Sequence, residues 1–170
     1  SEKALKSTVL KGNLKNISKL KKPVIVFSHG IGENALGIVR SLGRKKIPII
    51  LFVIKGYKSV VVYSKYCNIV LELPDIKREI ILNEIIFVSQ NNIDKPVLFF
   101  DNCLMVNLFH NDKELLNKYC HLTQDIGEFT DKTYQFDIAK KAKVALPKTW
   151  KPETWIEFND QVVSPNRLIA

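Results

Sequence analysis

Two glycines near the start of the chain lie in a pattern that could bind an anion or a nucleotide. The segment GIGENA, residues 30–35, fits the G-x-G-x-x-G/A pattern of turns between a strand and a helix. Glycine lets the backbone turn tightly and approach a ligand, and the free N–H groups of the following helix favour a phosphate or carboxylate. The simpler alternative is that the glycines only permit a tight turn. The candidate binding residues here are Gly30, Ile31, Gly32 and Asn34.

A second pair of candidate residues, Asp101 and Asn102, follows an apolar run at residues 97–100. Open parallel sheets bind ligands outside the carboxyl ends of their strands, near the point where the strand order reverses. Both residues could therefore face the same crevice as Gly30. The alternative for Asp101 is that it caps the helix or turn that follows, because aspartate is a favoured cap.

A dinucleotide would need an acidic residue near the end of the second strand to hold the ribose hydroxyls. The chain has Ile54, Lys55 and Gly56 there instead, which disfavours NAD. Lys55 could contact a ribose phosphate, so an NADP-binding module remains a minor alternative, but lysines in loops are usually only solvated.

No catalytic residue and no metal ligand is predicted. The three histidines lack partners at metal-binding spacing and lack a nucleophile nearby in sequence. His29 alone lies inside the glycine turn, which makes it worth testing by mutation. The cysteines are widely spaced and form no CxxC pair, as expected of a protein in a reducing cytoplasm. The other residues concerned are His110, His121, Cys67, Cys103 and Cys120.

The hydrophobic pattern predicts strands alternating with helices. Four apolar runs without polar alternation are typical of strands covered on both faces, and apolar residues at helical spacing connect them. This order favours right-handed crossovers and a parallel sheet. We therefore expect an α/β fold, a three-layer Rossmann-like sheet of about four to five strands. The predicted strands are 24–27, 47–54 or 49–54, 69–73 and 97–100, and the predicted helices between them are 35–43 and 76–88.

Two further helices are predicted after the sheet, at 113–120 and at 132–142, the second capped by Thr130 or Asp131. Prolines interrupt the remainder, which carries large apolar side chains with no obvious partner in so short a tail. We expect this tail to pack on a further module or on another copy of the chain. Its aromatic residues are Trp150, Trp155 and Phe158.

The positive charge is local rather than general. The chain of 170 residues has a formal net charge of +9, and seven lysines lie in residues 1–22. Because Leu10, Leu14 and Ile17 are at helical spacing, these residues predict a basic helical arm with its lysines in water. The alternative is that these lysines contact an anionic partner, but we expect no nucleic-acid partner. The apolar runs are too short to cross a membrane and no signal peptide is recognised, so a cytoplasmic location is expected.

Several short segments, in order, resemble the N-terminal part of ATP-grasp carboxylate-amine ligases related to the large subunit of carbamoyl-phosphate synthase. In that family a Rossmann-like pre-ATP-grasp domain precedes the ATP-grasp module, and the two form the substrate cleft. The resemblance implies an arm at 1–22, a pre-ATP-grasp domain at 23–122 and a tail at 123–170. The matching segments are Gly30-x-Gly32, Leu36–Gly43, Ile47–Ile49, Tyr63–Cys67, and Asp131-Lys132 followed by Ala145–Trp150.

The resemblance also implies roles for particular residues. The turn from Gly30 to Asn34 and the strand end near Asp101 would border the acceptor substrate, a carboxylate or an amine. Lys132 would lie near the nucleotide phosphates, a sensible role for an ammonium group, although a solvated lysine is the alternative. ATP and Mg²⁺ would be the cofactors of the full-length parent protein.

The chain lacks the second ATP-contacting lysine, the glycine-rich lid and the Mg²⁺-binding carboxylates that follow in the family. Phosphoryl transfer depends on positioned cations, so the chain alone is expected to be inactive, as a fragment or as one subunit of a split enzyme. The competing interpretation is a stand-alone module that binds a small anion or associates with itself through the C-terminal tail.

Overall fold

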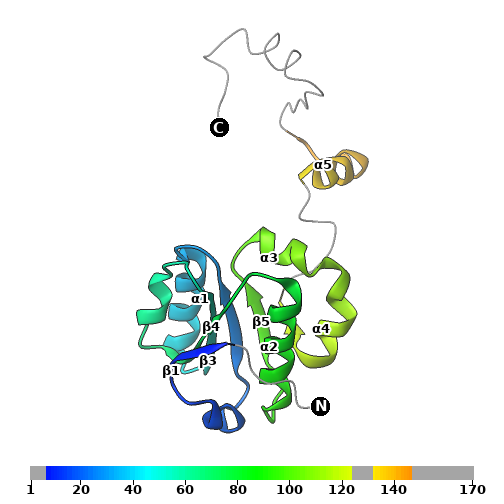
Figure 1. Ribbon diagram of the computed structural model, residues 1–170. Coiled ribbons are helices and arrows are strands. Elements are labelled where there is room, and N and C mark those ends of the chain that lie inside the picture. Colours follow the sequence, from blue (N-terminus) through cyan, green and yellow to red (C-terminus); the bar gives the residue numbers. More distant parts are fainter. Residues whose placement is uncertain (1–6, 124–131, 147–170) are drawn as a thin grey trace. The chain divides into compact units, whose positions relative to one another are not determined.

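The computed structural model describes residues 7–123 and 132–146 (Figure 1). The chain divides into two units, the first ending at Asp131 and the second beginning at Lys132, and each is described by itself. In the first unit the strands are β1 (Thr8–Lys11), β2 (Val24–Ser28), β3 (Ile49–Ile54), β4 (Cys67–Leu73), β5 (Val97–Phe100) and β6 (His121–Leu122). Its helices are α1 (Glu33–Arg44), α2 (Arg78–Gln90), α3 (Cys103–Leu108) and α4 (Lys113–Tyr119), with 3₁₀ turns η1 (Leu14–Lys19), η2 (Val60–Tyr63) and η3 (His110–Asp112).

The strands form a six-stranded sheet in the order β1-β4-β3-β2-β5-β6. All neighbouring strands run parallel except β1, which is antiparallel to β4. The chain moves outward from β2 to β3 and β4, and then returns to place β5 on the other side of β2, so the strand order reverses beside β2. The predicted α/β class is confirmed, and the strand order is compatible with a Rossmann-like fold. The sheet has six strands rather than the predicted four to five, and it is parallel except at β1.

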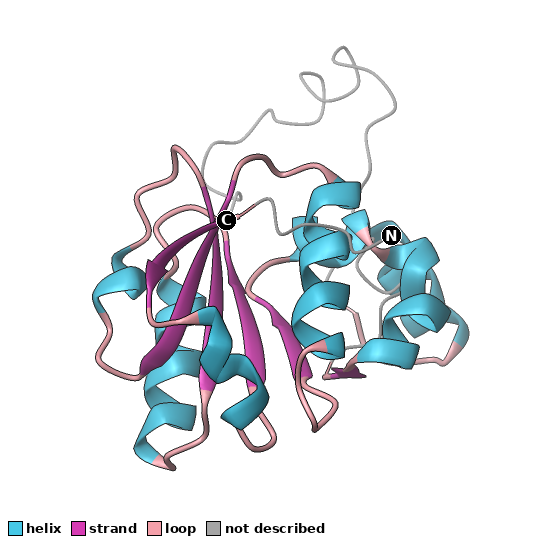
Figure 2. Ribbon diagram, turned by 60° about the horizontal axis from the view of Figure 1, so that its bottom comes forward, coloured by secondary structure: helices cyan, strands magenta, loops and turns pink. Residues whose placement is uncertain are grey.

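Helices cover both faces of the sheet (Figure 2), which explains why its central strands are apolar throughout. On one face, Val26 of β2 packs with Val39 of α1 in the same buried cluster. On the other face, Phe27 packs in a second cluster that also contains residues of α2, α3 and α4. Successive residues of β2 therefore point into different cores, as the period of a strand requires.

The predicted helical arm over residues 1–22 is wrong for the part that the structure describes. Thr8–Lys11 forms the edge strand β1, and only η1 is helical. Gly12 ends β1 with a φ of +85°, and a Cβ atom there would lie 2.4 Å from the Asn68 carbonyl oxygen of β4. The long-range pairing with β4 thus overrides the local helical spacing of Leu10 and Ile17. Of these two side chains only Ile17 is buried.

The other elements lie within a few residues of their predicted bounds, apart from α3 and β6, which were not predicted. In the second unit, the predicted helix is α5 (Lys132–Lys141). No helix in the described parts of the chain has the length and apolar character of a membrane span. The predicted cap at Thr130 or Asp131 and the aromatic tail with Trp150, Trp155 and Phe158 lie outside the described residues.

Candidate functional site

The glycine turn connects β2 to α1 beside the point where the strand order reverses. Gly30 and Gly32 have φ angles of +78° and +86°, and Gly32 is the N-cap of α1. The first hydrogen bond after the turn joins the Leu36 N–H to the Gly32 carbonyl at 2.8 Å. The N–H groups of the first turn of a helix have no partners within it. The amino end of α1 therefore offers N–H donors next to the end of β5.

The two glycines of the turn differ in the space that surrounds them. A Cβ atom at Gly32 would lie 2.4 Å from Ser28 Oγ and 2.9 Å from Ser59 Oγ, so no side chain fits there. A Cβ atom at Gly30 would meet nothing within 4 Å. Gly32 is needed for packing as well as for its backbone conformation. Gly30 borders open space, where a ligand could approach the backbone.

Asp101 connects the turn to the end of β5 by two hydrogen bonds. Its Oδ2 accepts a hydrogen bond from the His29 N–H at 2.9 Å, and its carbonyl oxygen accepts one from Asn34 Nδ2 at 3.0 Å. The side chain is only 8% exposed, and burial raises the pKa of its carboxyl group. The structure thus brings together two sets of predicted site residues that are far apart in the sequence, since Asn34 and Asp101 are separated by 67 positions.

Asn102, not Asp101, caps the helix that follows β5. Its Oδ1 accepts a hydrogen bond from the Met105 N–H at 3.0 Å, and its Nδ2 donates to Asp101 Oδ1 at 2.8 Å. Both carboxylate oxygens of Asp101 therefore already accept hydrogen bonds from the protein. In this state Asp101 and Asn102 hold the turn against the end of β5, and the N–H groups at the amino end of α1 are the donors left for a ligand.

His29 lies within the turn and contacts Tyr57. The two ring centroids are 4.6 Å apart at an interplanar angle of 50°. The Nε2 atom of His29 is buried without a hydrogen-bond partner among the described residues. Tyr57 itself is 48% exposed, so an aromatic side chain and an imidazole form one wall beside the glycine turn.

A segment between β3 and η2 supports the turn from behind. Ser28 Oγ and Ser59 Oγ are 3.0 Å apart in a buried hydrogen bond, and the Val60 N–H donates to the Ile31 carbonyl at 3.2 Å. Ile31 is itself 61% exposed at the tip of the turn. The roles of Ser28, Tyr57 and Ser59 were not predicted from the sequence. The only local signal was a serine that caps η2, since the Val61 N–H donates to Ser59 Oγ.

The charges around the turn are mixed. Glu33 is exposed in the first turn of α1 and its charge contributes to raising the Asp101 pKa. A carboxylate at this position favours the helix but opposes a multiply charged anion. Lys55 is exposed after β3. Lys132, the proposed phosphate contact, is the exposed first residue of α5 in the second unit.

The remaining candidates for chemistry show no assembled centre. Within the described ranges, no three His, Cys, Asp or Glu side chains come together as metal ligands. Burial raises the pKa of the Cys67 and Cys120 thiols to about 11, so neither is a reactive thiolate at neutral pH. Searches with models of protein families, among curated proteins and among solved structures give no match to this chain.

Proposed function

We propose that this chain supplies the acceptor-substrate part of an ATP-dependent carboxylate-amine ligase of the ATP-grasp class. The observation that carries the proposal is the glycine turn at the strand-order reversal, with open N–H donors and unfilled space at Gly30. In an open parallel sheet this is the position where ligands bind. The Rossmann-like arrangement would then be a pre-ATP-grasp domain, followed by a module that binds ATP and Mg²⁺.

The charges favour a small acceptor substrate over a nucleotide at this turn. A polyphosphate would be repelled by Glu33, whose carboxylate lies at the same end of α1. A compact carboxylate can accept hydrogen bonds from the N–H groups, while a neighbouring amine would be attracted by Glu33. In the proposed reaction, ATP phosphorylates a carboxylate, and an amine displaces phosphate from the acyl phosphate. ATP would be held by the following module, with Lys132 near its phosphates.

The proposal is tested by joining the chain to an ATP-grasp module and measuring ADP release over a panel of carboxylates and amines. We expect release that requires an amine as well as ATP and Mg²⁺, and none from the chain alone. Gly30→Asn should lower this rate because asparagine tolerates a positive φ and places a side chain in the open space. Gly56→Asn is the matched control, with a φ of +88° and nothing within 4 Å. If no pair of carboxylate and amine gives ADP release, the ligase proposal is wrong.

A second candidate is a stand-alone module that binds a small anion. It is favoured by the fact that the turn, its serine support and Asp101 all belong to the first unit. In that case carboxylate binding would occur without the second module and would not lead to ADP release. An NADP-binding role for Lys55 is the weaker possibility, and NADP at millimolar concentration would then raise the melting temperature.

A further inference from the structure

The starts of the five parallel strands lie side by side at one edge of the sheet. The register places Cys67, Ile49, Val24, Val97 and His121 in one row across β4, β3, β2, β5 and β6. The carboxyl ends of these strands, with the glycine turn, lie at the opposite edge. The segments that enter the strands therefore form a second surface, the amino edge, which consists of residues 19–23, 44–48, 64–66, 93–96 and 117–120.

An exposed lysine precedes each of these five strands. It comes two residues before the row in β4, β2 and β5, and three residues before it in β3 and β6. Neighbouring strands are about 4.8 Å apart, so these lysines form a row of positive charges across the sheet. The row consists of Lys65, Lys46, Lys22, Lys95 and Lys118, and further exposed cations of the same segments are Lys19, Lys21, Arg44 and Lys45.

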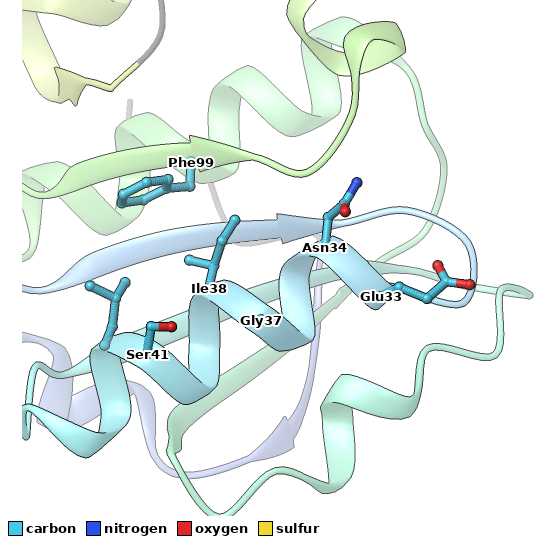
Figure 3. A pocket seen from close by; sticks show the side chains of 7 residues that line it. Glu33, Asn34, Gly37, Ile38, Ser41 and Phe99 are labelled. Carbon is cyan, nitrogen blue, oxygen red and sulfur yellow. The ribbon is translucent and has the colours of Figure 1, made fainter.

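The negative charge of the first unit lies elsewhere. Asp94 is the only carboxylate in the segments of the amino edge, and its Oδ2 accepts a hydrogen bond from the Lys22 N–H at 2.7 Å. Figure 3 shows that α1 runs back from the strand ends beside Glu33 toward Ser41, which brings Arg44 to the amino edge. Among the described residues, no cation of the amino edge forms an ion pair with a carboxylate. Its positive charge is therefore not balanced by the protein.

Two lysines of the row have a backbone conformation that disfavours lysine. Lys22 and Lys46 have φ angles of +47° and +59°, and within the described first unit they are the residues other than glycine with a positive φ. Glycine or asparagine adopts this conformation more readily. A helix dipole explains a cation at Lys46, just after α1, but Lys22 follows no α-helix. The chain thus keeps positive charge here against the local backbone preference, which points to a use for it.

An exposed aromatic side chain accompanies the row of lysines. Tyr63, the last residue of η2, is 89% exposed. The carbonyl oxygen of the next residue, Ser64, accepts a hydrogen bond from Lys11 Nζ at 2.8 Å. Lys65 Nζ lies 5.4 Å from the ring centroid of Tyr66. Aromatic rings beside a row of cations are typical of surfaces that bind single-stranded nucleic acid, because bases stack on the rings and phosphates contact the cations.

We propose that the amino edge binds single-stranded nucleic acid, with its phosphates along the row of lysines and a base stacked on Tyr63. Neighbouring strands rotate by about 20–25°, so the row follows the twist of the sheet and is not flat. A flexible single strand can follow such a row, whereas a planar lipid bilayer contacts only part of it.

This proposal differs from the expectation of no nucleic-acid partner, which rested on the lysines of residues 1–22. The fold adds the cations of four later segments to those lysines. The amino edge lies opposite the glycine turn, so binding there does not depend on the proposed ligase activity.

Fluorescence anisotropy with a labelled oligouridylate of about 20 nucleotides tests the proposal on the full chain. The affinity of the wild type should fall steeply between about 50 and 200 mM salt. Lys22→Asn combined with Lys46→Asn should raise the dissociation constant at least about fivefold and reduce this salt dependence. The melting temperature of this variant should be no lower than that of the wild type, because asparagine tolerates a positive φ.

Lys58→Asn combined with Lys77→Asn is the matched control. It removes the same charge from exposed positions after β3 and before α2, at the opposite edge, and should bind like the wild type. Tyr63→Leu should weaken binding several-fold, and Tyr63→Phe should not, because phenylalanine keeps the ring on which a base stacks.

Three results would overturn the proposal: an oligonucleotide that does not bind the wild type, equal binding by the two lysine double variants, or wild-type binding by Tyr63→Leu. Sedimentation with vesicles that contain phosphatidylserine gives the comparison with a membrane. Binding to these vesicles without binding to the oligonucleotide would assign the amino edge to an anionic membrane surface and would also overturn the proposal.

Discussion

Both the backbone conformation of the turn and its packing require glycine at position 32. We expect Gly32→Ala to lower the free energy of unfolding by roughly 2–4 kcal/mol, since it combines a left-handed backbone with a collision at Ser28 Oγ. Gly30→Ala has only the backbone cost, about 1–2 kcal/mol, because its Cβ would meet nothing. Urea unfolding of both variants measures the difference. Equal losses would show that the close packing around Gly32 contributes nothing.

The raised pKa of Asp101 predicts how its contribution to stability depends on pH. Burial disfavours the ionised form, so the carboxyl pKa is higher in the folded than in the unfolded protein. The protonated group therefore contributes most stability below the unfolded value of 3.8, and this contribution is lost as the pH rises through the folded pKa.

Asp101→Asn removes this titration. The stability of the wild type minus that of Asp101→Asn should be greatest in acid and should fall as the pH rises to neutrality. Urea unfolding curves at a series of pH values give this difference. A difference that grows with pH would mean that the His29 N–H stabilises the carboxylate more than burial opposes it.

At the residue scale, the sequence predicted that two distant segments would meet, because each one follows a parallel strand. The glycine pattern and the polar residues after β5 predicted that Gly30 and Asp101 would be close, and the His29 to Asp101 hydrogen bond brings the two segments together. Ser59 and Tyr57 could not be predicted because their contacts depend on how η2 folds back onto the turn. No local pattern encodes such a contact.

At the element scale, Gly43 sets how closely α1 approaches the segment before β4. A Cβ atom at this position would lie 2.3 Å from Tyr66 Cβ and Cγ. Gly43→Ala should therefore lower the free energy of unfolding by about 1–3 kcal/mol, because neither backbone can move without disturbing the core.

The matched control for Gly43→Ala is Gly37→Ala in the same helix. It should raise the free energy of unfolding by about 0.5–1 kcal/mol, since its Cβ meets nothing. Thermal unfolding of the two variants at the same protein concentration compares them. A loss at Gly37 as large as that at Gly43 would contradict the packing described for α1.

The elements that sequence reasoning predicted are those whose hydrophobic pattern is complete within the element. β2, β3 and α1 each carry enough apolar residues to be recognised on their own. β1 was wrongly predicted as part of a helix, because its conformation comes from pairing with β4. β6 has only two residues, His121 and Leu122, and exists by pairing with β5. Long-range pairing is not visible in a local pattern.

At the scale of the whole molecule, β1 closes one edge of the sheet. Removing residues 1–12 would expose the β4 edge, which includes the buried residues Val70 and Leu71. An exposed apolar edge strand pairs readily with other chains. We expect this deletion to lower the melting temperature and to cause aggregation on warming, as measured by light scattering. A deletion of residues 1–6 keeps β1 and should behave as the wild type; equal behaviour of both deletions would show that β1 is dispensable.

The proposal depends on the N–H groups after β2, which bind the carboxylate of a small substrate, with Glu33 beside them for an amine. ¹H–¹⁵N correlation spectra recorded during titration with a panel of such compounds test it most directly. We predict shifts concentrated in residues 30–35, and their loss in Gly30→Asn but not in Gly56→Asn. If no compound moves these signals, or if Gly30→Asn responds like the wild type, the glycine turn is not a binding site.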